Sequence, residues 1–524
     1  MARARRRGGP AADDRRRGQP ECLGGRRSAP VRGLAPASRG RREFRRRIAL
    51  RGLGGGHVDQ FDFVIIGAGA AGEAAAFEAR HRGASVAIID RRWVGGSCPH
   101  IGCIPSKSLL ASAGRHASNP ATWSWRQASE RRDWMINRKP DAAEPDDMAH
   151  VEPLEKVGAV VYHGEAEVAD RGVVEVRHDG AIHRVLARNV VVAVGSHSKV
   201  PPVRGLEAIE VWTNREATLA RELPKSLLVL GGGPTGCELA QAYVRFGVPT
   251  TIVQSGDRLM PTDHPRNSAV VADALREDGV DVRLKARAVA AHGGAGHDGA
   301  HVVDLSDGST AEGHAILLAV GRSFPIDDLG LECYGVDTSG ETAFPRDGRL
   351  RVADGLWVIG DPAGPELHTH QAHYQGEVAV RMALGDSIRP DYRALPRASY
   401  TDPEAAFVGV SLEQAQEAGI DAIELTADFA SSARGYGIMA KRGHVTIIVD
   451  RASRTLVGAA MACPDASAAI HECVLAIKAR VTIDVLADTI HAFPSTSRIL
   501  NGLFADARRA LHASSLDPGS VRGG

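Results

Sequence analysis

Two stretches of this chain follow one plan, in which an apolar strand leads into a glycine-rich turn and then a helix. The first, FDFVIIGAGAAGEAAAFEARHRGASVAIID, occupies residues 61–90, and its turn contains Gly67, Gly69 and Gly72. Asp90 ends the second strand-like run, 23 residues after Gly67. Such glycines permit a tight turn and let a pyrophosphate approach the helix N-terminus, while the acid can accept a ribose hydroxyl. This stretch therefore predicts a dinucleotide-binding unit.

The same plan returns at residues 226–254, SLLVLGGGPTGCELAQAYVRFGVPTTIVQ, where Gly231, Gly233 and Gly236 occupy the turn. Gln254 lies 23 residues after Gly231, so the spacing of the first copy is repeated. An acid at that position would repel a 2′-phosphate, so the amide admits NADPH without requiring it. The choice between NADH and NADPH stays open. Two such units predict two dinucleotides, or one dinucleotide and a flavin.

Charge is distributed unevenly along the chain. Residues 1–51 contain 17 Arg, no Lys and 4 acids, a net +13, which leaves −12 for the remaining residues. The head is rich in Arg, Gly and Pro, and we expect residues 1–57 to form a disordered extension. The mildly acidic remainder argues against a nucleic-acid partner. No apolar run reaches the roughly 18 residues of a membrane span, so we expect no membrane partner either.

Of the seven cysteines only Cys98 and Cys103 are closely spaced, in GGSCPHIGCIPSK at residues 95–107. One close pair is not the pattern of a secreted disulfide scaffold, and it favours a reducing, cytoplasmic location. In an ideal helix the Cα atoms of residues five positions apart are separated by roughly 8–9 Å. A disulfide needs a separation of about 4.4–6.8 Å between the two Cα atoms. The pair can bond only if the turn is distorted, and Pro99 and Gly102 allow that distortion.

Three interpretations of this pair are a redox-active disulfide, a metal site and inert thiols. Structural zinc needs four ligands, and His100 adds only one to the two cysteines, so we expect no metal. A dithiol beside two dinucleotide units favours a relay of electrons from nicotinamide through flavin to a disulfide.

Further landmarks follow in order: VVAVGS ending at Ser196, GGGPTGCE (231–238), LLAVGRSFPIDDLGLE (317–332), LWVIGDPAG (356–364) and YTDPEAAFVGVS (400–411). With the two stretches above, they resemble the class I FAD-dependent pyridine nucleotide-disulfide oxidoreductases over about residues 60–508. Dihydrolipoamide dehydrogenase, glutathione reductase and mercuric reductase belong to that family.

The resemblance implies an α/β fold with two Rossmann-like dinucleotide-binding domains and a C-terminal α+β dimerisation domain. The FAD-binding domain would comprise residues 58–200 and 321–392, and the NAD(P)-binding domain residues 201–320. Residues 393–524 would form the interface that pairs two subunits into a homodimer.

The resemblance also implies roles for individual residues. Cys98 would exchange with substrate, Cys103 would contact the flavin, and Lys107 would lie near flavin N5 and pair with Glu238. The residues expected to bind FAD are Gly67, Gly69, Gly72, Asp90, Gly96, Lys107, Gly195, Gly360 and Asp361. Those expected to bind NAD(P)H are Gly231, Gly233, Gly236, Gln254 and Gly321.

The C-terminal segment HAFPSTSR, residues 491–498, departs from the family pattern. Phe493 stands where the family has its catalytic His, and Arg498 stands where the family has the partner Glu of that His. Because Phe cannot transfer a proton, reduction of a substrate disulfide should be slow. His491, two residues before Phe493, is the candidate replacement.

Three functions are compatible with these features. The first is an FAD-dependent NAD(P)H oxidoreductase that passes electrons through Cys98 and Cys103 to a small or protein-borne disulfide, or to a thiophilic metal ion. The second is an NAD(P)H–quinone reductase or diaphorase, in which electrons leave directly from the flavin and no His–Glu couple is needed. The third is a non-catalytic flavin redox sensor.

Overall fold

The computed structural model describes residues 59–515 except 122, 139–144, 179, 339–343 and 345–348, all within the unit His57–Gly524. The extension expected at residues 1–57 lies outside the described residues. Among the described residues, no helix is both long enough and apolar enough to cross a membrane.

The first glycine turn belongs to a seven-stranded sheet in which β1 pairs with both β2 and β5. Strand β1 pairs in parallel with β2 through Phe63 and Val86, and in parallel with β5 through Val64 and Val190. Its buried run of apolar residues is typical of a strand covered on both faces. The strands of this sheet are β1 (Asp59–Ile66), β2 (Val86–Asp90), β3 (Val160–Asp170), β4 (Val173–His178), β5 (Ala181–Val192), β15 (Arg351–Ala353) and β16 (Leu356–Val358).

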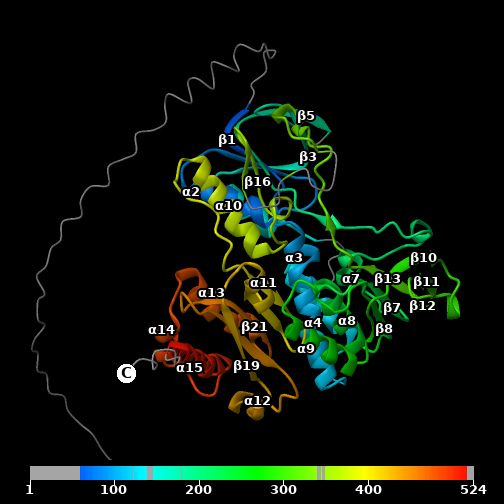
Figure 1. Ribbon diagram of the computed structural model, residues 1–524. Coiled ribbons are helices and arrows are strands. Elements are labelled where there is room, and N and C mark those ends of the chain that lie inside the picture. Colours follow the sequence, from blue (N-terminus) through cyan, green and yellow to red (C-terminus); the bar gives the residue numbers. More distant parts are fainter. Residues whose placement is uncertain are drawn as a thin grey trace, which may run out of the picture. The chain divides into compact units, whose positions relative to one another are not determined.

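Helices α2 (Ala70–His81) and α10 (Thr369–Ala383) pack side by side next to this sheet (Figure 1). Small residues allow this close approach, because a Cβ on Gly376 would lie 2.4 Å from the carbonyl oxygen of Ala71. The first residues of the two helices, Ala70 and Thr369, line the same cavity as Cys98 and Cys103. The other helices inserted in this part are α3 (Ser97–Ile101), α4 (Cys103–Ser118), α5 (Trp125–Asn137) and α6 (Met148–Lys156), with the 3-10 turns η3 (Leu331–Tyr334) and η4 (Asp361–Ala363).

The second glycine turn belongs to a separate, four-stranded parallel sheet of order β13-β7-β8-β9. A three-stranded antiparallel sheet, β10-β11-β12, is inserted along the chain between β9 and β13. The elements are β7 (Leu227–Leu230), β8 (Thr250–Val253), β9 (Asp281–Arg283), β10 (Ala288–His292), β11 (His301–Leu305), β12 (Thr310–Gly313), β13 (Ala315–Leu318), α7 (Asn214–Leu219), α8 (Pro234–Arg245), α9 (Pro265–Glu277), η1 (Leu206–Ala208) and η2 (His297–Gly299). The chain enters this part through β6 (His197–Ser198) and leaves it through β14 (Arg322–Ser323), and these two strands pair antiparallel.

The C-terminal part is a five-stranded antiparallel sheet of order β17-β18-β21-β20-β19. Helices α13 and α15 bury apolar residues such as Ile470 and Phe504 against it. The elements are β17 (Pro396–Ser399), β18 (Ala405–Gly409), β19 (Ala422–Asp428), β20 (His444–Asp450), β21 (Leu456–Ala462), α11 (Leu412–Glu417), α12 (Ala433–Gly437), α13 (Ala466–Ala479), α14 (Ile483–Asp488) and α15 (Thr496–Ser515). The predicted fold class, two Rossmann-like units followed by an α+β domain, is confirmed.

Candidate functional site

The turn between β1 and α2 is built from backbone that leaves no room for side chains at two positions. Gly67 has φ +102, and a Cβ on Gly72 would lie 2.0 Å from the carbonyl oxygen of Gly67. At Gly69, by contrast, the nearest atom to a Cβ would be 3.7 Å away. Asp90 closes the turn, because its carboxylate accepts a hydrogen bond of 2.8 Å from the backbone N–H of Ala68. Because a Cβ at Gly69 would have no close neighbour, free space remains at the N-terminus of α2.

The turn between β7 and α8 repeats this geometry position by position. Gly231 has φ +107, and a Cβ on Gly236 would lie 2.1 Å from the carbonyl oxygen of Gly231. A Cβ on Gly233 would meet nothing within 4 Å. Gln254 takes the place of the acid, and its Oε1 accepts a hydrogen bond of 2.9 Å from the N–H of Gly232. Both turns therefore fit the pyrophosphate of a dinucleotide at a helix N-terminus.

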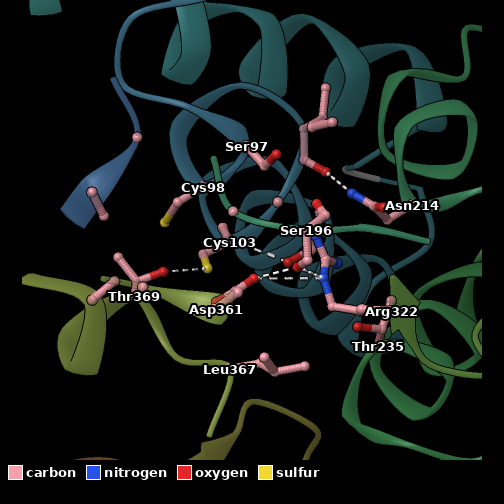
Figure 2. A pocket seen from close by; sticks show the side chains of 18 of the residues that line it. Ser97, Cys98, Cys103, Ser196, Asn214, Thr235, Arg322, Asp361, Leu367 and Thr369 are labelled. Atoms are coloured by element: carbon pink, nitrogen blue, oxygen red, sulfur yellow. Dashed lines mark hydrogen bonds and ion pairs between the residues drawn. The ribbon is translucent and has the colours of Figure 1, made fainter. Parts of the chain in front are cut away.

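A cavity of about 270 Å³ lies beside the cysteine pair (Figure 2). Both thiols line it, together with the predicted site residues Gly69, Gly195, Gly360, Asp361, Lys107 and Glu238. Its walls come from both glycine-turn units, since Ser97 belongs to the first and Thr235 to the second. No histidine lines this cavity among the described residues.

The backbone breaks between the two cysteines. Helix α3 ends at Ile101, Gly102 adopts φ −114 and ψ −115, and Cys103 begins α4. A Cβ on Gly102 would lie 2.9 Å from the carbonyl oxygen of Ser97, so the break requires glycine. The two thiols are not bonded to each other in this structure. The break supplies the distortion that a disulfide between Cys98 and Cys103 would need.

The two thiols differ electrostatically. A hydrogen bond from Cys98 lowers the pKa of Cys103 to about 6, and the nearby ammonium of Lys107 adds to this effect against the opposing effect of burial. The same hydrogen bond raises the pKa of Cys98. The hydroxyl of Thr369, at the start of α10, lies 3.7 Å from the sulfur of Cys103 (Figure 2). These opposite shifts favour the thiolate on Cys103 and the proton on Cys98 in the reduced pair.

Lys107 and Glu238 form an ion pair at the rim of the cavity. Lys107 Nζ lies 2.7 Å from Glu238 Oε2, with the lysine side chain 33% and the glutamate side chain 4% exposed. Lys107 lies one turn after Cys103 on α4, and Glu238 lies in the first part of α8. The structure thus brings together two side chains 131 positions apart. Tyr400, which sequence analysis did not single out, donates its backbone N–H to Glu238 Oε1 over 2.9 Å.

A hydrogen-bond network links Ser196 and Arg322, which lie at the two crossings between the units, to Asp361 of η4. The hydroxyl of Ser196 donates a hydrogen bond to Asp361, and Arg322 donates from Nε to the Ser196 hydroxyl over 2.5 Å (Figure 2). Arg322 also donates from Nη2 to the carbonyl oxygen of Ser196 over 2.8 Å. Asp361 is a residue that the sequence predicts to bind the flavin, whereas Ser196 and Arg322 have no predicted role. Their segments were recognisable as landmarks, whereas the contacts between them were not.

The structure does not bring His491 to the thiol pair. Its Nε2 lies 2.6 Å from Glu472 Oε1, and its Nδ1 lies 2.9 Å from the carbonyl oxygen of Thr489. The side chain is 5% exposed and lies outside the lining of the cavity. Phe493 is 73% exposed. Within this subunit His491 holds the loop after α14 against α13.

The remaining predicted residues divide between the two turns and the cavity. Gly96 supports the first turn from the neighbouring loop, because a Cβ there would lie 2.6 Å from Gly69 Cα. Gly321 has φ +120 and open space around it, next to the crossing strand β14. Among the described residues, no group of three or more His, Cys, Asp or Glu side chains could hold a metal ion.

Two protein-family models match the chain. Residues 61–376 match Pyridine nucleotide-disulphide oxidoreductase, and residues 395–502 match the dimerisation domain of the same family.

Curated relatives match over most of their length. Dihydrolipoyl dehydrogenase from Chlorobaculum tepidum is 32% identical over 461 residues, which cover 86% of this chain and 98% of the relative. Mercuric reductase from Streptomyces lividans is 32% identical over 463 residues, which cover 84% of this chain and 94% of the relative.

Solved structures match as well. The Cu(II) complex of the HOCl-induced flavoprotein disulfide reductase RclA from Escherichia coli has a TM-score of 0.77 at 27% identity, covering 86% of this chain and 99% of the other. LpdA from Mycobacterium tuberculosis has a TM-score of 0.75 at 27% identity, covering 86% and 100%.

Proposed function

Because the chain belongs to the pyridine nucleotide-disulphide oxidoreductase family of FAD-dependent enzymes that use NAD(P)H, we propose that it reduces a thiophilic metal ion through Cys98 and Cys103. We assign the first glycine turn, Asp90 and Asp361 to FAD, and the second glycine turn and Gln254 to NAD(P)H. The proposed domain limits are those of the family, with residues 58–200 and 321–392 around 201–320, and with 393–524 pairing two subunits into a homodimer.

The observation that carries this proposal is a pair of thiols in the wall of the cavity, in a chain that has Phe493 and Arg498 where the family has its proton-transfer couple. Reduction of an organic disulfide expels a thiolate, and a positioned acid that protonates it contributes about 10²–10⁴-fold to the rate. A metal ion accepts electrons without a leaving group that needs a proton. The acceptor that this site serves best is therefore a thiophilic ion such as Hg(II), or Cu(II), whose reduced form Cu(I) thiolates bind well.

The electrons and protons of this step balance. The sulfurs of Cys98 and Cys103 bind the ion, an S–S bond forms between them, and the two electrons released reduce Hg(II) to Hg(0) or two Cu(II) to two Cu(I). The proton of Cys98 leaves to solvent. Bound FAD supplies the two-electron carrier by which NAD(P)H reduces the disulfide again. Lys107 and Glu238 hold their charges fixed at the rim where the nicotinamide would approach.

Two of the similar proteins support this choice of acceptor. The relative from Streptomyces lividans is named mercuric reductase, and the RclA structure from Escherichia coli is titled a Cu(II) complex. Other relatives are named dihydrolipoyl dehydrogenase, but this chain has Phe493 and Arg498 where that family's proton-transfer couple is expected. The departure from the family pattern favours metal ions over disulfides.

The test is NAD(P)H oxidation by the purified holoenzyme with Hg(II), Cu(II), lipoamide, oxidised glutathione and menadione as acceptors. Cys98→Ser should abolish turnover with both metal ions. Cys333→Ser is the matched control, since Cys333 is also partly exposed but lies on η3, outside the lining of the cavity. It should behave as wild type.

Other outcomes separate the alternatives. Metal-dependent turnover that survives Cys98→Ser would disprove the proposal. Menadione turnover that exceeds metal turnover and survives the same change would identify a quinone reductase. Turnover with lipoamide or glutathione as fast as with metal ions would identify an ordinary disulfide reductase.

A further inference from the structure

Tyr400 lies where three parts of the protein meet. It follows β17 of the C-terminal sheet, yet it contacts both members of the ion pair formed by Lys107 and Glu238. Its backbone N–H donates to Glu238 Oε1 over 2.9 Å, and the centroid of its ring lies 4.8 Å from Lys107 Nζ. An ammonium within about 6 Å of an aromatic ring is attracted to its face. One residue of the C-terminal domain thus touches a lysine of one unit and a glutamate of the other.

The loop that carries Tyr400 is anchored to a single face of α8. Glu238, Gln241 and Arg245 are three and four positions apart, so their side chains share that face. Gln241 is fully buried, accepts from the N–H of Asp402 over 2.7 Å and donates to the carbonyl oxygen of Asp402 over 2.9 Å. Arg245 Nη1 donates to the carboxylate of Asp402 over 2.9 Å. These contacts fix the loop on the helix that bears Glu238.

Glu238 is 3% exposed and uses both carboxylate oxygens, one for Lys107 and one for Tyr400. A buried carboxylate is stable as an anion only when its oxygens have partners. Burial lowers the pKa of Lys107, and the charge of Glu238 outweighs that effect, so the pKa is raised. The position of the lysine ammonium therefore depends on how the glutamate is held.

We propose that Tyr400 is a positioning residue for the Lys107–Glu238 pair, so that the docked C-terminal domain sets the geometry at which NAD(P)H reduces the enzyme. This inference rests on the role proposed above for the pair. Tyr400 acts through its ring on Lys107 and through its backbone on Glu238, and it needs no contact with substrate.

The experiment compares Tyr400→Leu, Tyr400→Phe and Tyr436→Leu in the full-length holoenzyme. Leucine removes the ring, phenylalanine keeps it, and Tyr436 is a more exposed tyrosine of the same domain that serves as the matched control. The first measurement, made without NAD(P)H, is the acylation rate of Lys107 by a succinimidyl ester, followed by peptide mass spectrometry. Tyr400→Leu should raise that rate about threefold or more, because the ring stabilises the unreactive ammonium. Tyr400→Phe and Tyr436→Leu should leave it unchanged.

The second measurement is anaerobic stopped-flow reduction of the bound flavin by NADH. Tyr400→Leu should lower the limiting rate constant about tenfold and change the apparent Kd for NADH less than twofold, and Tyr400→Phe should restore the wild-type rate. Unchanged Lys107 acylation and an unchanged rate constant in Tyr400→Leu would overturn the inference. An equal effect of Tyr436→Leu would also overturn it, because the effect would then be a general one on the domain.

The two proposals fail in different experiments. If the metal-reductase proposal is wrong, Cys98→Ser keeps metal turnover, while the effect of Tyr400→Leu on Lys107 remains. If the pair has no role in reduction by NADH, Glu238→Gln leaves the limiting rate constant at the wild-type value. If only the Tyr400 inference is wrong, Glu238→Gln slows reduction and Tyr400→Leu does not.

Discussion

Alanine at Gly233 and alanine at Gly236 should have opposite consequences, although both glycines belong to the same turn. A Cβ on Gly236 would lie 2.1 Å from the carbonyl oxygen of Gly231 and 3.3 Å from Cγ1 of Val229. A backbone oxygen cannot rotate away, so the helix must shift from the strand. A Cβ on Gly233 would meet nothing within 4 Å, and its φ of −75 suits any residue.

The expected magnitudes follow from these distances. Overpacking costs about 1–3 kcal/mol, and the better helix propensity of Ala offsets up to about 1 kcal/mol of that cost. The net cost lies between about 0 and 3 kcal/mol, and we expect Gly236→Ala to lower the free energy of unfolding by about 1–2 kcal/mol, the middle of that range. This corresponds to about 2–8 °C in Tm for a domain of roughly 150–250 residues. Gly233→Ala should change stability by less than about 0.5 kcal/mol.

The affinity for NADH, in contrast to stability, should be affected by Gly233→Ala. The added methyl of Gly233→Ala would stand in the open space at the N-terminus of α8, where a phosphate approaches. Loss of a favourable anion contact with a helix N-terminus costs up to about 2 kcal/mol. The Kd for NADH should therefore rise about tenfold, since each factor of ten corresponds to about 1.4 kcal/mol.

The assay is thermal unfolding together with anaerobic stopped-flow reduction of the bound flavin, in which the dependence of the rate on NADH concentration gives the apparent Kd for NADH. Gly502→Ala is the control for both measurements, since a Cβ there would also meet nothing within 4 Å and Gly502 lies on α15, far along the chain from the turn. It should keep wild-type binding and at least wild-type stability. Equal losses of Tm in Gly233→Ala and Gly236→Ala, or unchanged NADH binding in Gly233→Ala, would refute the steric reasoning.

Three further predictions concern proton and nucleotide chemistry. In the reduced protein, alkylation of Cys103 by iodoacetamide should accelerate as the pH rises through about 6, because the thiolate is the nucleophile and the pKa of Cys103 is lowered by Cys98 and Lys107. Lys107→Met should move that inflection to higher pH, which mass spectrometry of the labelled peptide would detect. Gln254→Glu should lower kcat/KM for NADPH at least tenfold and spare NADH, because the carboxylate repels a 2′-phosphate; parallel steady-state kinetics would check it. The double change Phe493→His with Arg498→Glu should raise lipoamide turnover by about 100-fold, the lower end of what a placed acid–base couple contributes.

Much of the fold could be predicted because it is encoded in local pattern. Apolar strand, glycine turn and helix follow one another within 30 residues at 61–90, and the constraint at Gly67 and Gly72 is a property of that short segment. The break at Gly102 was likewise predictable, because a spacing of five does not fit a disulfide on a regular helix. Features that depend only on residues close together in the chain could therefore be predicted from the sequence.

The contacts that complete the site could not be predicted in this way. Tyr400 meets Glu238 across 162 positions, and Thr369 meets Cys103 across 266 positions. No periodicity or spacing encodes such contacts, since they depend on how segments far apart in the chain pack against one another. The pairing of His491 with Glu472 is of the same kind, because it depends on the packing of α13 against the loop after α14.

The antiparallel pairing of β6 with β14 has a consequence for how this protein could be re-engineered. Ser198 lies opposite Arg322, so the two ends of the intervening 123 residues are held side by side by this strand pair. A nucleotide-binding domain with a different preference could replace these 123 residues between β6 and β14 without distorting the sheet that contains β1. Both covalent connections between the inserted domain and the rest of the chain would then run through these two short strands.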